Sequence, residues 1–312
     1  MPELPEVTAL AEALSERTAG MVVARIEVAA ISALKTFAPP VQAAVGATVL
    51  GWTRLGKHLV LDLVDTEGEP LYVVTHLARG GWARWREDPP ARPAGVGGRG
   101  ARGAPGLALR LVFAAGPEGG PLGQPPGTPL GALDLTEAGT QKRLAVHVAR
   151  DPSEVPAVAR LGPDPLDPGF DAEAFHAILA AAGRSQVKGV LRDQSRIAGI
   201  GNAYSDEILH AARISPFAPA GALPAEAEAR LYAAMRETLG HAVTTARGTD
   251  PTSLKAEKKA GMAVHGRTGA ACPVCGDVVR EVSFADSSLQ YCATCQTGGK
   301  PLADRRMSRL LK

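Results

Sequence analysis

The feature that most constrains this 312-residue chain is the spacing of its four cysteines, C-x2-C-x16-C-x2-C, at Cys272, Cys275, Cys292 and Cys295. Each C-x2-C pair forms a tight knuckle that directs two sulfurs inward, and two knuckles meeting across a β-hairpin complete a tetrahedral Zn²⁺ site. Two disulfides are the alternative, which a reducing compartment disfavours. The spacing therefore predicts a small C-terminal module with one structural zinc ion. A zinc ribbon alone does not identify its partner, because such ribbons also mediate protein contacts.

The charge distribution bears on the partner. The formal net charge is only +2, but residues 250–312 hold ten Lys/Arg and six Asp/Glu, a net of +4. A basic surplus at one end is typical of a phosphate-binding surface, and an ordinary solvated face has the same composition. No apolar run of 18 residues is present, and the first six residues lack the basic and apolar regions of a signal peptide. We therefore expect a cytoplasmic protein with no membrane partner.

The apolar spacing indicates an α+β multidomain protein. Aromatic residues are only 4% of the chain, so the core must be mainly aliphatic. The pattern predicts a leading helix over 7–20 and then a β-rich region with strands over 22–28, 59–63, 71–77, 107–113, 133–135 and 144–148. Stretches rich in Pro and Gly, 89–106 and 116–131, are expected to be loops. Alanine-rich helices follow near 172–182, 185–192, 202–212 and 224–246. The expected domains are 1–150, 151–262, 263–296 and a basic tail over 297–312.

The chain begins Met1-Pro2-Glu3-Leu4-Pro5-Glu6. One interpretation is structural, because proline suits the first turn of a helix and acidic side chains there favour its dipole. A second is chemical. Removal of Met1 leaves a secondary amine at Pro2, and an α-amino group titrates near pH ~8, so part of it is neutral and nucleophilic at physiological pH. Such an amine can attack a sugar C1′ to form an imine, and Glu3 is placed beside it to move protons.

Four blocks together resemble the formamidopyrimidine-DNA glycosylase/endonuclease VIII family over nearly the whole chain. They are the start through Val7, the segment 54–61 with the following His76-Leu77, the segment 197–204, and the cysteine module. The third block, IAGIGNAY, is similar to the family's helix–two-turns–helix signature. The resemblance implies an N-terminal β-sandwich with a leading helix, a helical DNA-binding domain and a C-terminal zinc finger. It also implies a bifunctional glycosylase/AP lyase that acts on damaged, double-stranded DNA as a monomer.

The resemblance assigns roles to matching positions. Pro2 is the expected Schiff-base nucleophile, Glu3 the general acid/base, and Glu6 a supporting residue that orients DNA or water. Lys57 is expected to hold the phosphate near the flipped nucleotide. Asn202 follows Gly199 and Gly201 at a helix N-terminus, where amide groups bind phosphate. Taken alone, Lys57 is an ordinary surface lysine and Asn202 an ordinary N-cap.

The sequence departs from the family pattern at several positions. Ser287 stands where the family finger carries an arginine, so its phosphate contact must weaken or come from elsewhere, such as Arg280. Arg79 replaces a methionine that fills the gap left by the flipped base. Lys142 and Arg143, after Gln141, occupy the region of the family's wedge segment. The stretch 248–266 is shorter than the base-capping loop of 8-oxoguanine enzymes, which favours oxidised pyrimidines or ring-opened purines. The tail over 297–312 is left with three alternatives: it contacts the DNA backbone, it binds a partner, or it does neither.

Other titratable residues receive structural assignments. His76, His147 and His265 are expected to be structural or phosphate-facing, since four cysteines already complete the metal site. Asp193 and Glu207 lie on predicted helices and are expected to be structural. Two alternatives to the enzyme remain open. One is a catalytically weak or silent relative that binds damaged DNA, and the other is a zinc-ribbon interaction protein with no DNA role.

Overall fold

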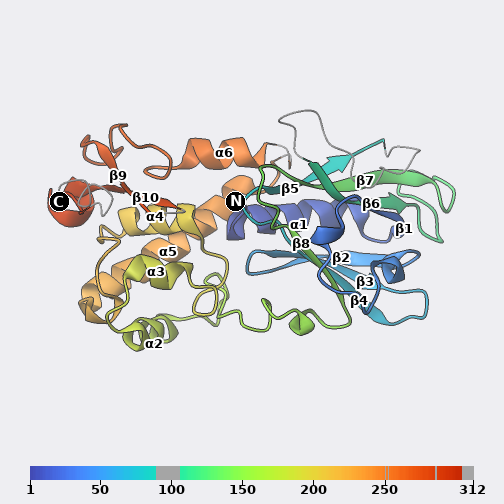
Figure 1. The fold of residues 1–312 in the computed structure, drawn as a ribbon, viewed down its shortest axis with the longest axis horizontal. Coiled ribbons are helices and arrows are strands. Elements are labelled where there is room, and N and C mark those ends of the chain that lie inside the picture. The colour runs from blue at the N-terminus through green and yellow to red at the C-terminus, as the bar shows by residue number, and fades with distance from the viewer. Residues whose placement is uncertain (89–105, 250, 252, 285–286, 304–312) are drawn as a thin grey trace. The chain divides into compact units, whose positions relative to one another are not determined.

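The computed structural model describes residues 1–88, 106–249, 251, 253–284 and 287–303. These residues form two compact units (Figure 1). Unit 1 comprises residues 1–160 together with 246–254, and unit 2 comprises 161–245 together with 255–312. The expected loop over 89–106, apart from its last residue, and the tail beyond residue 303 lie outside the described residues.

Unit 1 contains a leading helix and an eight-stranded antiparallel sheet in the order β5-β7-β6-β1-β2-β3-β4-β8. Its elements are α1 (Leu4–Thr18), β1 (Val22–Val28), β2 (Thr48–Leu55), β3 (His58–Val64), β4 (Pro70–His76), β5 (Gly81–Arg86), β6 (Gly106–Ala114), β7 (Pro129–Glu137) and β8 (Ala145–Ala149). Short 3-10 turns at Ile31–Ala33, Val41–Ala44 and Pro152–Glu154 lie between strands or after the last one.

The sheet folds into two layers where β1 meets β2. These two strands share one register pair, Val22 with Thr48, whereas each continues into a full ladder on its other side. In Figure 1 the two groups of strands are seen above and below α1. Apolar side chains of α1, such as Leu10 and Leu14, and of both strand groups form one buried core. The two layers and the leading helix are the expected β-sandwich.

Charged residues form a ladder across four strands on the face opposite the core. Arg110 of β6 donates to both carboxylate oxygens of Asp134 on β7, at 2.5 and 2.9 Å, and lies 3.3 Å from Glu27 on β1. Arg86 of β5 also donates to Asp134 at 2.5 Å. Asp134 is only 2% exposed and Arg110 only 7%. Burial acts to raise the pKa of Asp134, but Arg110 and Arg86 outweigh it and hold that pKa below its usual value.

Unit 1 is discontinuous in the sequence. Residues 246–254 return to it after the long helix α5 (Ala225–Ala246) of unit 2. Leu254 is buried in the core of unit 1, and the Trp82 indole N–H donates to the Pro251 carbonyl at 3.1 Å. Arg247 forms a two-oxygen ion pair with Glu12 on α1, with a shortest distance of 2.7 Å. The segment is therefore an integral part of unit 1.

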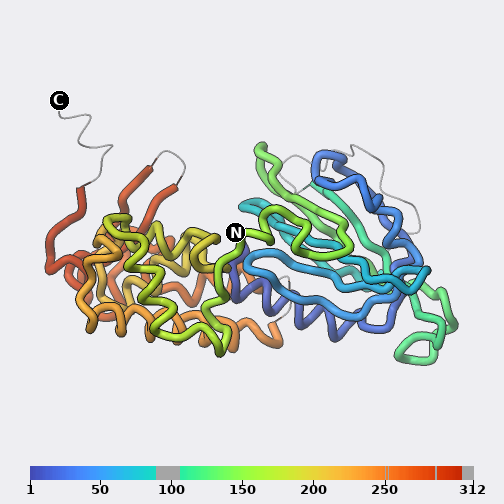
Figure 2. The backbone as a smooth tube through the Cα atoms, turned by 90° about the horizontal axis from the view of Figure 1, so that it is seen from below, coloured from blue at the N-terminus to red at the C-terminus, as the bar shows by residue number. Residues whose placement is uncertain are grey.

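Unit 2 is helical and includes a two-stranded hairpin near its end; Figure 2 traces its backbone. Its elements are α2 (Ala172–Ala182), α3 (Val187–Arg192), α4 (Asn202–Ala211), a 3-10 turn (Ala220–Ala222), α5 (Ala225–Ala246), α6 (Leu254–Gly261), β9 (Val279–Ser283), β10 (Ser288–Cys292) and α7 (Ala293–Thr297). The first residue of α6 and the last of α5 belong to unit 1. Within the described residues, none of the helices has the length and apolar character required to cross a membrane.

The expected fold class is confirmed, and the differences concern elements with weak patterns. The sequence did not predict β2, β5, α6 or α7. In β2 a bulge between Val49 and Gly51 interrupts the alternation, and Leu50 is 62% exposed. In α6 Leu254 is the one buried residue, so no apolar stripe marks the helix.

Candidate active site and DNA-binding residues

The start of the chain forms a closed cap on helix α1. Glu3 is the N-cap residue, in extended backbone, and Pro5 occupies the first turn, where a missing N–H is tolerated. The Glu3 backbone N–H donates to Glu6 Oε2 at 2.7 Å, and the Glu3 side chain accepts the Glu6 backbone N–H in return. This reciprocal capping box satisfies N–H groups that a helix start leaves unpaired.

Burial distinguishes this cap from an ordinary one. Glu3 and Glu6 are each 2% exposed, and Pro2 is also buried, whereas Met1 is 42% exposed. Two carboxylates buried at a helix N-terminus are held where the helix dipole stabilises negative charge. The arrangement therefore places a buried, hydrogen-bonded carboxyl group one residue from the nitrogen that Met1 removal would release.

Lys57 lies at the tip of the β2–β3 hairpin, also in unit 1. Leu55 pairs with His58, so the connection is a two-residue turn of Gly56 and Lys57. Gly56 has φ +57°, a value that glycine supplies at low cost in the first position of such a turn. Lys57 is 8% exposed, so its side chain lies within the surface rather than extending into solvent.

Two imidazoles lie beside Lys57 on paired strands. His58 and His76 are directly opposite in the β3–β4 ladder, with ring centroids 5.0 Å apart. Burial, and then the neighbouring His58 and Lys57, lower the pKa of His76 to about 4. Burial likewise lowers the pKa of His58 and that of His147, which faces the same side of the sheet. Near neutral pH these rings are uncharged, so Lys57 is the cationic member of the group.

The sequence placed Arg79, Lys142 and Arg143 against DNA, and the structure puts all three on exposed turns of unit 1. Arg79 follows Ala78, which has φ +53° in the turn between β4 and β5. Lys142 and Arg143 belong to the β7–β8 connection, where Lys142 Nζ donates to the Glu137 carbonyl at 2.6 Å. The Glu137 carboxylate in turn accepts the Arg143 backbone N–H at 2.7 Å. Their roles toward DNA stay predictions.

Asn202 begins helix α4 in unit 2, as expected. Gly201 is the N-cap, and Gly199 has φ +89° in the preceding turn. The Asn202 side-chain amide donates to the Ser288 carbonyl of β10 at 2.7 Å. Its Oδ1 is buried and meets no donor among the described residues. One amide hydrogen of this candidate phosphate ligand is thus already occupied by the hairpin.

A buried ion-pair group beneath Asn202 was not anticipated. Lys188 of α3 is 5% exposed, and its Nζ donates to Asp206 Oδ1 at 2.5 Å, to Ser205 Oγ at 2.8 Å and to the Asn202 carbonyl at 3.2 Å. His265 Nδ1 lies 2.7 Å from the other Asp206 oxygen. Lys188 therefore fixes the first turns of α4. A signal was present in the sequence, since Lys188 is close to the apolar residues Val187 and Val190 in a short helix, and a buried lysine requires a partner.

Glu207, expected to be structural, clamps the segment before the cysteines onto α4. Its carboxylate accepts the backbone N–H groups of Ala263, Val264 and His265 at 2.7, 3.0 and 2.8 Å. Glu207 is 8% exposed. Asp193, the other acid assigned a structural role, forms a local turn by accepting from Ser195.

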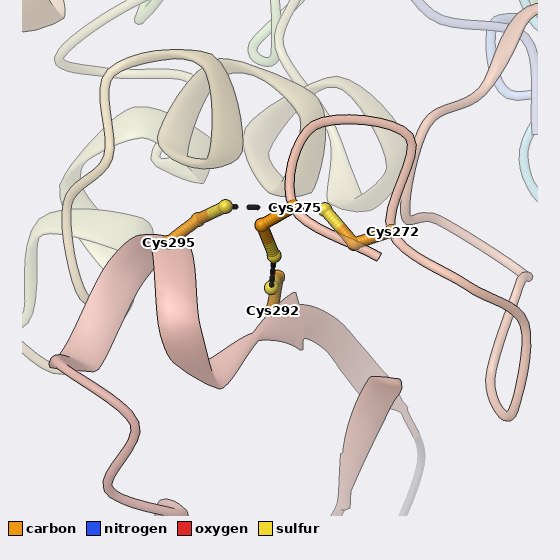
Figure 3. Close-up of side chains that lie close together, drawn as sticks. All are labelled: Cys272, Cys275, Cys292 and Cys295. Atoms are coloured by element: carbon orange, nitrogen blue, oxygen red, sulfur yellow. Dashed lines mark hydrogen bonds between the residues drawn. The ribbon is translucent and has the colours of Figure 1, made fainter. Parts of the chain in front are cut away.

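The four cysteines converge at the end of unit 2 (Figure 3). Cys272 and Cys275 come from one knuckle, and Cys292 and Cys295 from the end of β10 and from α7. All four Sγ atoms lie within 4.8 Å of one another, and Gly276 has φ +77° as the knuckle requires. The Cys275–Cys292 and Cys272–Cys295 sulfurs are 3.3 and 3.9 Å apart. A tetrahedral Zn²⁺ with Zn–S bonds of about 2.3 Å separates sulfurs by about 3.8 Å, so the group fits one metal ion.

Local hydrogen bonds favour the thiolate form of two of these sulfurs, those of Cys272 and Cys275, whereas burial raises the pKa of Cys292 and of Cys295. The Asp277 backbone N–H lowers the pKa of Cys275. Burial raises the pKa of Cys272, but backbone N–H groups of the knuckle and the His210 side chain outweigh it. Thiolate sulfur is the form that binds zinc.

Arg280, proposed to replace the finger arginine, lies on β9 opposite Tyr291 rather than at the hairpin tip. Its guanidinium is 3.7 Å from Asp277, and its Nε meets no acceptor among the described residues.

A capped Pro-Glu start on a β-sandwich, a helix N-terminus after glycines and a four-cysteine finger define a class of DNA glycosylase architecture. Three family models match in this order. They are the formamidopyrimidine-DNA glycosylase N-terminal domain over residues 1–102, its H2TH domain over 161–253, and the zinc finger found in FPG and IleRS over 269–298.

Similar proteins agree. A formamidopyrimidine-DNA glycosylase of Moorella thermoacetica is 34% identical over 290 residues, covering 90% of this chain and 94% of that one. An uncharacterized formamidopyrimidine-DNA glycosylase-like protein of Mycobacterium tuberculosis is 58% identical over 157 residues, which cover 50% of this chain and 98% of that protein. The crystal structure of MutM (Fpg) from Thermus thermophilus superposes with a TM-score of 0.74 at 30% identity, covering 96% of this chain and 100% of that one. The chain belongs to the formamidopyrimidine-DNA glycosylase family.

A further solved structure shares the fold. The Lactococcus lactis Fpg in complex with DNA containing an abasic site has a TM-score of 0.75 at 23% identity, covering 95% of this chain and 99% of that one.

Proposed function

We propose that the protein is a bifunctional DNA glycosylase/AP lyase of base-excision repair, with Pro2 as nucleophile and Glu3 as general acid/base. The observation that carries the proposal is the capped start of α1, where the buried Glu3 and Glu6 carboxylates are fixed beside Pro2. A helix cap alone does not need two carboxylates and a proline removed from water. Relatives named as glycosylases over the whole chain add support.

The proposed chemistry begins after Met1 is removed. The Pro2 nitrogen forms a bond to C1′ of the damaged nucleotide, and the C1′–base bond breaks, so the base leaves with the bonding pair and takes up the proton that the Pro2 nitrogen loses. Glu3 supplies a proton to the opening sugar ring, and an iminium ion links Pro2 to C1′. The iminium acidifies the C2′ proton. Loss of that proton breaks the C3′–O bond by β-elimination, and a second elimination releases the 5′-side phosphate.

The protein is proposed to bind double-stranded DNA as a monomer, mainly through contacts with the phosphates. Lys57, held at a hairpin tip beside uncharged imidazoles, provides a single positive charge for one phosphate. In unit 2 the α4 N-terminus and the second amide hydrogen of Asn202 provide another site. The damaged nucleotide must leave the helical stack before Pro2 can reach it. The finger is proposed to hold one structural Zn²⁺ through its four cysteines and to take no part in bond breaking.

The decisive experiment is borohydride trapping on a duplex with one abasic site, because that substrate removes lesion preference from the question. Protein with a free Pro2 should form a covalent adduct, and protein that retains Met1 is the matched control. Pro2→Gly should lower adduct formation, and Glu3→Gln should nearly abolish base removal while DNA binding survives. No adduct from protein shown to bind the same duplex would favour a silent damage-binding relative. No salt-sensitive DNA binding at all would favour a zinc-ribbon interaction protein.

The lesion is proposed to be a ring-opened purine or an oxidised pyrimidine rather than 8-oxoguanine. The segment 248–266, where a long base-capping loop is expected for 8-oxoguanine, includes the short helix α6. Its start is anchored by the burial of Leu254 in unit 1. Cleavage rates on otherwise identical duplexes carrying each lesion test this, and a preference for 8-oxoguanine would overturn it.

A further inference from the structure

Helix α4 contacts the cysteine module through one stripe of polar side chains. Asn202, Asp206 and His210 are four residues apart, so they project from the same face of the helix. Asn202 donates to the Ser288 carbonyl at 2.7 Å, and Asp206 accepts the Gln290 N–H at 3.3 Å. His210 completes the stripe, with Nε2 3.2 Å from Cys272 Sγ.

The direction of the His210–Cys272 hydrogen bond follows from the chemistry of a zinc-bound cysteine. A zinc-bound Cys272 is a thiolate, which has no proton to give, so a bond to it requires the proton on Nε2. His210 is 5% exposed and Cys272 2%, so water does not compete for this contact. A buried donor that reaches a thiolate stabilises its charge and fixes its direction, as groups behind the ligands of metal sites do.

We propose that His210 is a positioning residue of the zinc site, which donates from Nε2 to the Cys272 thiolate and thereby makes zinc retention depend on helix α4. The proposal rests on the zinc assignment above. It adds that the metal site is completed by a residue more than 60 positions before the first cysteine. The same helix begins at Asn202, so the candidate phosphate site and the metal site share one rigid element.

The test is the rate of zinc transfer from the full-length protein to a chromogenic chelator. His210→Phe removes the donor at a similar volume. Loss of a residue behind a metal ligand weakens metal binding by about 10- to 100-fold, so zinc release should be faster by about that factor. His210→Gln retains an N–H donor and should restore a rate near that of the original protein. Leu209→Ala is the matched control, because Leu209 is a fully buried neighbour whose side chain has no hydrogen-bond donor.

A spectroscopic measurement separates positioning from simple packing. In Co²⁺-substituted protein, His210→Phe should shift the thiolate-to-metal charge-transfer band, and Leu209→Ala should leave it in place. Equal zinc release rates for His210→Phe and the original protein would overturn the proposal. It would also be overturned if His210→Phe and Leu209→Ala accelerated release equally and neither variant shifted the charge-transfer band. Zinc content of the original protein is measured first, and its absence would refute the zinc assignment itself. None of these readouts depends on glycosylase activity.

Discussion

Glu207→Gln tests how the cysteine module is held to helix α4. The Glu207 carboxylate accepts three backbone N–H groups, and each hydrogen bond to a charged group contributes about 1.5–3 kcal/mol. The glutamine oxygen can replace Oε1 and keep the Val264 and His265 bonds as neutral ones, worth about 1 kcal/mol each. Its NH2 group then faces the Ala263 N–H, which loses its acceptor. Allowing for non-additivity, we expect a loss of about 2–4 kcal/mol.

The assay is hydrogen exchange measured by mass spectrometry. A loss of about 2–4 kcal/mol corresponds to exchange about 30- to 700-fold faster at Ala263, Val264 and His265, if the segment opens locally. Glu226→Gln is the control, because Glu226 forms an exposed ion pair with Arg230 and should change nothing measurable. Exchange within about threefold of the original at these three amides would refute the reasoning. A uniform rise throughout unit 2 would show that the clamp is not local.

Three further predictions concern unit 1. Asp134→Asn leaves Arg110 buried without its main partner and should lower the free energy of unfolding in urea by about 3 kcal/mol; a loss below about 1 kcal/mol would contradict the buried-pair argument. Ala78→Gly should raise the free energy of unfolding by about 1 kcal/mol, because Ala78 has φ +53°. A decrease would show that packing of the Ala78 methyl group outweighs the backbone strain. Burial lowers the His76 pKa from 6.5 to about 4, so the unfolded state binds more protons between those values, and stability present above pH 6.5 is lost as pH falls toward 4. That loss is at most about 3 kcal/mol, and His76→Gln should flatten the curve of unfolding free energy against pH, whereas parallel curves would contradict it.

Patterns local in sequence predicted most of the architecture. Strand 22–28 and helix 172–182 have the bounds that apolar spacing indicated, because one face of each element is buried. Cysteine spacing likewise predicted the four-cysteine cluster, since its geometry is set within each knuckle. Helix α6 was not predicted because Leu254 is its single buried residue, so the sequence shows no apolar spacing there.

Contacts between distant residues could not be read from the sequence. Arg110 shows only as a charge within an apolar strand, and the pattern does not reveal that its partners are on two other strands. Asn202, Asp206 and His210 can be recognised as one helical face. The partners of that face lie in the cysteine module, some 60 to 90 residues later, and the sequence does not show how that module packs on the helix.

The return of residues 246–254 to unit 1 limits how this protein can be divided. A fragment that stops at residue 160 lacks Leu254, and an emptied leucine position in a core costs about 2–5 kcal/mol. It also leaves the Trp82 indole without its acceptor and Glu12 without Arg247. The smallest autonomous form of unit 1 therefore consists of two pieces of chain, and the second must be joined by a linker or supplied as a separate peptide.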